Sequence, residues 1–172
     1  MNKKYSKRIR LKDFNYKGFY RYFLTICTFE KSKYFTDNGL VYKVLDVLRE
    51  VSNHCQFDIW AYCFMPDHLH LLIEGKDESS DMCKFVALFK QYSGYQFKKE
   101  CGRKLWEENY YEHILRKKEA TQKVATYIFE NPIRKGIVED YTSYPYLGSF
   151  VFGLDSDPKG SRYENKECSA RL

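Results

Sequence analysis

The amino-acid sequence predicts an α+β fold, in which an antiparallel sheet carries helices packed on one face. Runs rich in aromatic and β-branched residues alternate along the chain with segments whose apolar residues have helical spacing. The predicted order is strand, helix, strand, strand, helix, strand and a final helix. The first six elements match a split β-α-β pattern, which would leave the second face of the sheet free.

The first half of the chain contains three predicted strands and one helix. Aromatic and β-branched side chains predict a strand at 22–29, and apolar residues at helical spacing predict a helix over 40–55. A second strand is predicted at 57–65, where the following Pro-Asp pair favours a tight turn. A third strand at 68–74 would form a hairpin with the second.

The second half contains the other two predicted helices. A long helix is predicted over 82–100, and Gly102 would end it. A short fourth strand is predicted at 113–116. The last helix spans 118–130 and closes at the Asn-Pro pair that follows.

These elements form one predicted domain over residues 1–153, followed by a polar tail at 154–172 whose composition is typical of poorly ordered segments. Residues 1–20 form a basic arm that is rich in aromatic side chains. The aromatic residues at 5–22 fit either a stacking arm for single-stranded bases or the core of the first strand and its lead-in.

Charge and cysteine content narrow the function classes. The 172 residues include 29 Lys and Arg against 23 Asp and Glu, a net charge of +6. This excess fits an anionic partner such as nucleic acid, and equally a solvated basic surface. The 6 cysteines form no Cys-x-x-Cys pair and no zinc ribbon. No export signal and no membrane span are recognised, so we expect a cytoplasmic protein without a membrane partner.

A pair of histidines offers a metal site. His68 and His70 lie two residues apart in the third predicted strand, so their side chains project to one face of the sheet. Leu69, Leu71 and Ile73 project to the other face. Two imidazoles side by side suit one metal ion. Two exposed or core-edge histidines are the alternative interpretation.

The last predicted helix offers residues that could complete this site. Tyr127 and Asn131 lie four residues apart and therefore share a helix face. The Asn131 carbonyl oxygen could be a third ligand, and the Tyr127 hydroxyl could be a nucleophile for covalent catalysis. Lys123 lies one turn earlier and could add positive charge. A metal that polarises a phosphoryl oxygen would complete a phosphodiester-cleaving site.

Alternatives remain open for each of these residues. Tyr127 could be a core aromatic residue, and Asn131 could simply end the helix. Glu112 and Glu130 are other candidate ligands, and His113 could be a fourth member of the site. Imidazole and oxygen ligands together accept Mg²⁺, Mn²⁺ or Zn²⁺, so the ligand set does not decide the ion.

Five parts of the chain together resemble the single-tyrosine transposases that carry a His-hydrophobic-His motif, and most of all the REP-associated tyrosine transposases. They are Met-Pro-Asp-His-Leu-His-Leu-Leu at 65–72, Trp106, Tyr-Tyr-Glu-His-Ile-Leu-Arg at 110–116, Tyr-Ile-Phe-Glu-Asn-Pro at 127–132 and Gly-Ile-Val at 136–138. The resemblance spans roughly residues 10–150. The His-x-His triplet is weak by itself, but it is specific in this context.

The resemblance implies a ferredoxin-like (RRM-like) sheet with both histidines on a central strand. It implies that Tyr127 is the nucleophile, which forms a 5′-phosphotyrosine and releases a 3′-hydroxyl. It also implies a divalent ion, in our prediction Mg²⁺ or Mn²⁺, held by His68, His70 and Asn131. The family acts on single-stranded DNA near imperfect hairpins. Asp67 departs from the Asn or Glu that members often carry.

We therefore predict a metal-dependent transposase or endonuclease that cleaves and rejoins single-stranded, hairpin-containing DNA in the cytoplasm, at the nucleoid. A non-catalytic single-strand-binding module and a replication or conjugation initiator are the alternatives. The chain could act as a monomer or as a homodimer that shares Tyr127. Basic residues that could contact the DNA backbone, or could merely be solvated, are Lys84, Lys90, Arg116, Lys117, Lys118 and Lys123.

Overall fold

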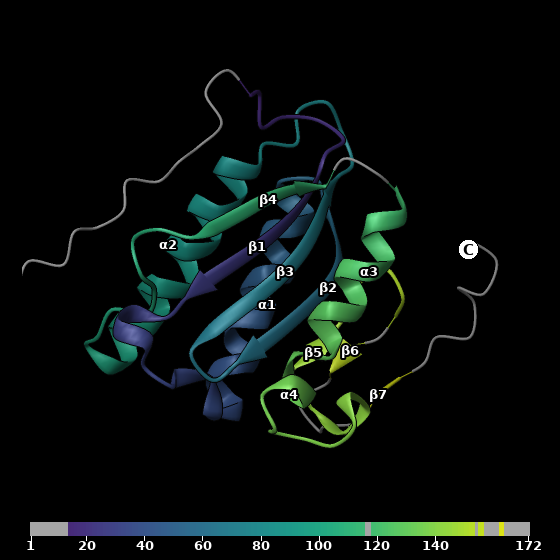
Figure 1. The fold of residues 1–172 in the computed structure, drawn as a ribbon. Helices are drawn as coiled ribbons and strands as arrows, with labels where there is room; N and C mark the ends of the chain where they lie inside the picture. Colours follow the sequence, from purple (N-terminus) through teal and green to yellow (C-terminus); the bar gives the residue numbers. More distant parts are fainter. Residues whose placement is uncertain (1–13, 116–117, 154, 157–161, 164–172) are drawn as a thin grey trace, which may run out of the picture.

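The computed structural model describes residues 14–115, 118–153, 155–156 and 162–163. Its main feature is a five-stranded antiparallel sheet with the order β4-β1-β3-β2-β5. Helices α1 and α2 lie behind this sheet in Figure 1, and α3 lies in front of it. The elements are β1 Arg21–Cys27, α1 Asn38–His54, β2 Phe57–Met65, β3 His68–Gly75, α2 Met82–Cys101, β4 Tyr111–Leu115, α3 Lys118–Phe129, α4 Asn131–Arg134 and β5 Leu147–Gly148, with a separate pair β6 Asp155–Ser156 and β7 Arg162–Tyr163.

The α+β prediction is confirmed, and most predicted elements lie within two residues of the observed ones. The end of the last predicted helix is more elaborate than expected. Helix α3 ends at Phe129, and the four-residue helix α4 begins at Asn131. Pro132 lies in the first turn of α4, where its missing N–H removes no helical hydrogen bond. A proline that closes one helix therefore also opens the next.

One face of the sheet packs against α1 and α2 and contains most of the core. Alternation along each strand sends every second side chain to this face. Its strand residues include Tyr22, Leu24 and Ile26 of β1 and Leu69, Leu71 and Ile73 of β3, and its helix residues include Val44, Leu48, Phe85 and Phe89. All of them are buried. The predicted direction of the three β3 residues is confirmed.

The opposite face is not free, which corrects that part of the sequence prediction. A second buried cluster joins this face to α3 and comprises Ala61, Cys63, Met65, Leu72, Leu115, Ala125, Ile128, Tyr144 and Leu147. Helix α3 contacts β2, β3 and β4. Its apolar residues recur at helical spacing and need a surface to cover, and the side of the sheet away from α1 and α2 provides it.

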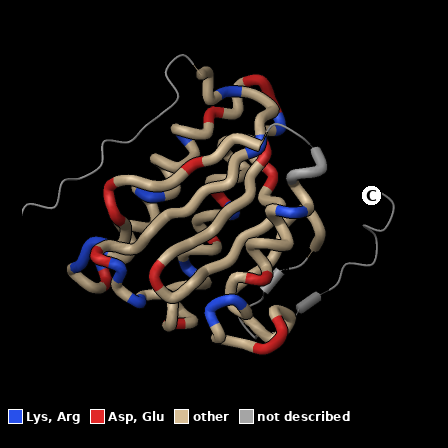
Figure 2. Tube along the Cα trace, viewed as in Figure 1, with Lys and Arg blue, Asp and Glu red and all other residues tan. Residues whose placement is uncertain are grey.

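The turn between β2 and β3 is held by the segment that follows β1. The backbone N–H and the hydroxyl of Thr28 both donate to the Asp67 carbonyl, at 3.0 and 2.9 Å. The Phe35 N–H donates to the Pro66 carbonyl at 3.0 Å. These bonds fix the start of β3, where the histidine pair begins. Figure 2 shows few charged residues along the middle of the central strands.

The ends of the chain lie partly outside the described residues. Residues 1–13 of the predicted basic arm and most of the predicted tail at 154–172 belong to this part. In the described end of the arm, Tyr16 is buried and Phe14 packs against the same core, which favours the core interpretation for these two residues. Among the described residues, no helix is long and apolar enough to cross a membrane.

Substituting Gly75 at the end of β3 should destabilise the fold. A Cβ atom at this position would lie 2.0 Å from the Gly18 carbonyl oxygen, so the backbone would have to move. We expect Gly75→Ala to lower the free energy of unfolding by about 1–3 kcal/mol in urea denaturation. Gly94→Ala is the matched control, since its Cβ would have only an ordinary contact with Trp106 at 3.7 Å. The control should be neutral or stabilising by up to about 1 kcal/mol. Equal losses in both variants would contradict this account.

Candidate active site

The two predicted histidines meet on the face of the sheet that α3 partly covers. Both project from β3, as strand alternation predicts. The Nε2 atoms of His68 and His70 lie 3.1 Å apart. His70 is only 7% exposed, so most of this pair is shielded from solvent.

Each imidazole is oriented through its other ring nitrogen. The Nδ1 of His68 donates to the Asp67 carboxylate at 2.6 Å, which leaves a lone pair on Nε2 of the neutral ring. The Nδ1 of His70 and the Thr25 hydroxyl share a hydrogen bond of 2.9 Å. Because a hydroxyl can donate or accept, Thr25 accommodates either tautomer of His70. Metal-binding histidines usually have such partners on the second nitrogen.

The 3.1 Å between the Nε2 atoms of His68 and His70 fits two ligands of one divalent ion. Two adjacent ligands at about 2.1 Å from an ion, at a right angle to each other, lie about 3 Å apart. Within the described part of the chain, no three His, Cys, Asp or Glu side chains gather closely enough to hold one metal. An amide oxygen is another kind of group that could serve as a third ligand.

Helix α3 brings Tyr127 to this pair. The rings of Tyr127 and His70 have centroids 6.3 Å apart, and Phe23 of β1 contacts both rings. Asn131, only 4% exposed, donates its Nδ2 to the Tyr127 carbonyl at 2.9 Å. The amide oxygen Oδ1 is thus the atom of Asn131 that could coordinate a metal.

A cation lies against the Tyr127 ring. The Arg134 guanidinium carbon is 4.2 Å from the ring centroid, and a 2.7 Å ion pair with Glu130 holds the guanidinium. A cation at this distance from an aromatic face is electrostatically favourable. Glu130, an alternative metal ligand in the sequence prediction, is occupied by this ion pair.

Burial favours the neutral form of both histidines in the folded chain. Burial lowers the pKa of His70 to about 3, and electrostatic interaction with the neighbouring His68 and Lys31 acts in the same direction. Burial also lowers the pKa of His68, although the bond to Asp67 opposes this shift. Neutral imidazole is the form that binds metals.

The predicted DNA-contacting residues lie in different parts of the fold. Lys123 is exposed on α3, one turn before Tyr127. Lys84 is exposed on α2, which packs on the other face of the sheet. Arg116 and Lys117 lie outside the described residues, and Lys118 begins α3 but its side chain is not described.

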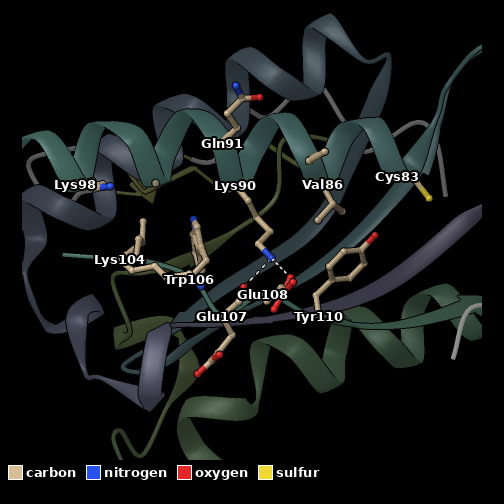
Figure 3. A pocket seen from close by; sticks show the side chains of 13 residues that line it. Cys83, Val86, Lys90, Gln91, Lys98, Lys104, Trp106, Glu107, Glu108 and Tyr110 are labelled. Atoms are coloured by element: carbon tan, nitrogen blue, oxygen red, sulfur yellow. Dashed lines mark hydrogen bonds between the residues drawn. The ribbon is translucent and has the colours of Figure 1, made fainter. Parts of the chain in front are cut away.

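Lys90 has a structural role on α2. It crosses a hollow of about 660 Å³ between α2 and residues 104–110, which Figure 3 shows. Its Nζ donates to the carbonyl oxygens of Glu107 and Glu108 at 2.8 and 2.7 Å. This hollow lies on the α1 and α2 side of the sheet, because Leu105 and Trp106 in its lining belong to that core. It is therefore separate from the histidine pair.

Strand β4 divides the remaining candidates between the two faces. Glu112 is the register partner of Leu24, which projects into the α1 and α2 core, so Glu112 projects away from the histidines. His113 is the partner of Phe23 and lies on the histidine side. His113 thus stays a candidate member of the site.

Three residues around the candidate site, two beside the histidine pair and one beside Tyr127, are absent from the sequence prediction. Thr25 and Phe23 reach the site because β1 pairs with β3, a contact between segments far apart in sequence. Alternation within β1 predicts that Phe23 and Thr25 share one face of the strand. It does not predict that they lie next to His70. Arg134 lies beyond the Asn-Pro break, where helical spacing from Tyr127 no longer applies.

The buried neutral His70 should make the metal-free protein sensitive to acid. Above about pH 6.5 this residue is neutral in both the folded and unfolded states. As the pH falls below that value, the unfolded chain takes up a proton that the folded chain does not. His70 should then lower the free energy of unfolding by up to about 1.4 kcal/mol per pH unit. Urea denaturation of His70→Gln in EDTA should give a shallower dependence between pH 7 and 5.

His54→Gln is the control for this measurement, since His54 is exposed at the end of α1. It should keep the pH dependence of the unchanged protein. A slope unaltered by His70→Gln would contradict the assignment.

Two relatives resemble this chain in sequence, and one solved protein resembles it in structure. A Haemophilus influenzae protein provisionally assigned as a REP-associated tyrosine transposase is 27% identical over 137 residues, covering 73% of this chain and 77% of the relative. The REP-associated tyrosine transposase of Escherichia coli K12 is 29% identical over 94 residues, covering 52% of this chain and 53% of the relative. A solved REP-associated tyrosine transposase bound to a REP hairpin superposes with a TM-score of 0.67 at 21% identity, over 81% of this chain and 82% of that one.

The solved structure establishes a common fold, which agrees with the α+β architecture described above. A family model described as transposase IS200-like matches residues 17–131, which include β1 to β4, α3 and the residues Tyr127 and Asn131. This match covers well over half of the chain. The chain therefore belongs to the IS200-like transposase family.

Proposed function

We propose that this protein is a metal-dependent DNA transposase that cleaves and rejoins single-stranded DNA through a 5′-phosphotyrosine on Tyr127. The observation that carries the proposal is the position of Tyr127 next to His70, with 6.3 Å between the two ring centroids. Beside them, the Nε2 atoms of His68 and His70 lie 3.1 Å apart. Membership of a transposase family supports DNA cleavage and strand transfer as the reaction.

His68 and His70, through Nε2, and Asn131, through Oδ1, would hold the divalent ion, which we expect to be Mg²⁺ or Mn²⁺. When bound, such an ion polarises a phosphoryl oxygen and offsets the charge that develops on it. The hydrogen bonds of His68 to Asp67 and of His70 with Thr25 hold the two imidazoles in the orientation that this role needs.

The Tyr127 hydroxyl attacks phosphorus and releases its proton to solvent, and the bond from phosphorus to the 3′-oxygen breaks as that oxygen takes up a proton. The DNA then carries a free 3′-hydroxyl on one side, and its 5′-phosphate is bonded to Tyr127. The Arg134 guanidinium over the ring stabilises negative charge on the phenolate, because a cation interacts favourably with an electron-rich ring. Attack by a 3′-hydroxyl on the phosphotyrosine reverses the step and rejoins the strands.

The proposed substrate is single-stranded DNA that contains a hairpin. Its support is the related transposase solved with a REP hairpin, together with the net positive charge of this chain. Tyr127 and His70 lie close together within one chain, which supports a monomer as the active unit. A homodimer that exchanges Tyr127 is the other arrangement that we considered.

Replacing Tyr127 should abolish a covalent protein–DNA adduct. We expect the unchanged protein with Mg²⁺ or Mn²⁺ to form this adduct on single strands that carry imperfect hairpins, detected by denaturing gel and mass spectrometry. Tyr127→Phe should form none and should still bind the DNA, because only the nucleophilic oxygen is lost. Tyr95→Phe, on the distant helix α2, should form the normal amount.

An adduct that survives in Tyr127→Phe would assign the nucleophile to another tyrosine. A second result would favour a non-catalytic binding module. In this case the folded wild-type protein forms no adduct with any of a broad panel of hairpins, and chelators do not change its affinity for DNA.

Mn²⁺ should stabilise the protein through the histidine pair. At about 100 times its Kd, a ligand of the folded state adds about 2.7 kcal/mol to the free energy of unfolding. We expect thermal melts to show this gain in the unchanged protein, to lose it on addition of EDTA, and to lose it in His68→Ala and His70→Ala. His54→Ala should respond like the unchanged protein. Stabilisation that persists in both site variants would place the metal elsewhere.

A further inference from the structure

An exposed aromatic strip continues from Tyr127 along β1 and β4. Tyr111 is the register partner of Thr25, and Thr25 is in turn the partner of His70. Side chains at paired positions project to the same face of a sheet. Tyr111 therefore lies on the histidine side, two strand spacings or about 10 Å from His70.

The rings of this strip contact one another in sequence. The Tyr111 ring centroid is 6.4 Å from that of Phe23, in an edge-to-face contact. Phe23 then stacks on His70 at 5.4 Å and meets Tyr127 edge-on at 6.0 Å. The strip thus connects the outer strand of the sheet with both the proposed nucleophile and the proposed metal ligands.

Helix α3 leaves this strip accessible. Tyr111 is 59% exposed and Tyr127 is 41% exposed. His113, the next side chain along β4 on this face, is exposed as well. Glu112 lies between them but projects to the other face, so no carboxylate of β4 borders the strip. An exposed aromatic surface without a neighbouring carboxylate can bind a nucleobase, which is flat and uncharged and is attached to a negatively charged phosphate.

We propose that Tyr111, supported by Phe23 and flanked by His113, is a stacking platform for one unpaired nucleobase next to the phosphate that Tyr127 attacks. This inference rests on the proposed function, since it takes the position of that phosphate from Tyr127 and His70. A phosphate at the histidine pair carries nucleosides on both sides, and the strip is the exposed aromatic surface that adjoins it. Aromatic side chains hold single-stranded bases by stacking and tolerate any base.

The platform also accounts for the use of single-stranded DNA in the proposed function. In a duplex both faces of each base are already stacked on neighbouring bases, so no face is available to Tyr111. An unpaired base can turn toward the protein and stack. The platform therefore selects an unpaired nucleotide at the cleavage position, whatever hairpin lies nearby.

The experiment measures stacking and affinity separately from cleavage. Full-length Tyr127→Phe is titrated with fluorescent single-stranded oligothymidylate, and with the same strand carrying 2-aminopurine, whose emission falls when the base stacks. Adding Tyr111→Ala to this background should weaken binding by roughly 5- to 150-fold, the usual range for one stacked base. It should also restore the 2-aminopurine emission.

Two further substitutions keep the test independent of folding. Tyr111→Ile preserves the strand preference of this position but removes the ring, and it should lose affinity as Tyr111→Ala does. Tyr111→Trp should retain the affinity and the quenching. Tyr95→Ala is the matched control, since Tyr95 is 68% exposed but lies on α2, away from this face. It should bind like the parent protein.

Several results would overturn the inference. One is unchanged binding and quenching in Tyr111→Ala and Tyr111→Ile; another is an equal loss in Tyr95→Ala. A third is a change in oligomeric state, measured by sedimentation, without loss of DNA binding, which would make β4 a protein interface. If the wild type forms no covalent adduct while Tyr111 variants still lose single-strand binding, the proposed function fails and the platform stands. If the adduct forms normally in Tyr111→Ala with unchanged affinity, only the platform fails.

Discussion

The antiparallel register between β1 and β3 determines which side chains can meet at the candidate site. It pairs Thr25 with His70 and Cys27 with His68. A slip by one residue would send both histidines into the core beneath α1 and α2 and bring three large apolar side chains to the outer face. The burial of Leu69, Leu71 and Ile73 opposes such a slip, because each would lose roughly 1.5–3 kcal/mol on exposure. The core beneath α1 and α2 thus stabilises the positions of His68 and His70 on the opposite face of the sheet.

The two faces of the sheet consequently have different roles: one forms most of the core, and the other carries the candidate site. Behind it, α1 and α2 bury the larger core, and even a basic residue such as Lys90 serves to hold a neighbouring loop. In front, α3 covers only part of the surface, so that Tyr127 reaches the histidines and remains accessible. A helix that covered the whole face would exclude any substrate, and an uncovered face would lack the tyrosine.

Local periodicity was enough to predict half of this arrangement. The alternation of a strand placed His68 and His70 on one face, because this pattern depends only on neighbours within a few residues. The shared helix face predicted for Tyr127 and Asn131 is interrupted, since Asn131 begins α4, although its amide still bonds to the Tyr127 carbonyl. The remaining features depend on contacts between distant segments. The order of the strands in the sheet, which no local pattern encodes, determines three of them. They are the face that α3 covers, the hydrogen bond between Thr25 and His70, and the pairing of Tyr111 with Thr25. Arg134 escaped prediction for a different reason, since a new helix begins between it and Tyr127.

The hydrogen bond from the Asn131 amide to the Tyr127 carbonyl joins the proposed third ligand to the backbone of the proposed nucleophile. Because of this bond, the two residues respond together to any displacement of the end of α3. Thermodynamic linkage then applies in both directions: an ion that draws the Asn131 oxygen toward it also favours one position of Tyr127, and a DNA strand that selects that position raises the affinity for the ion. In the proposed function, binding of the metal and binding of the DNA strand would therefore each raise the affinity for the other.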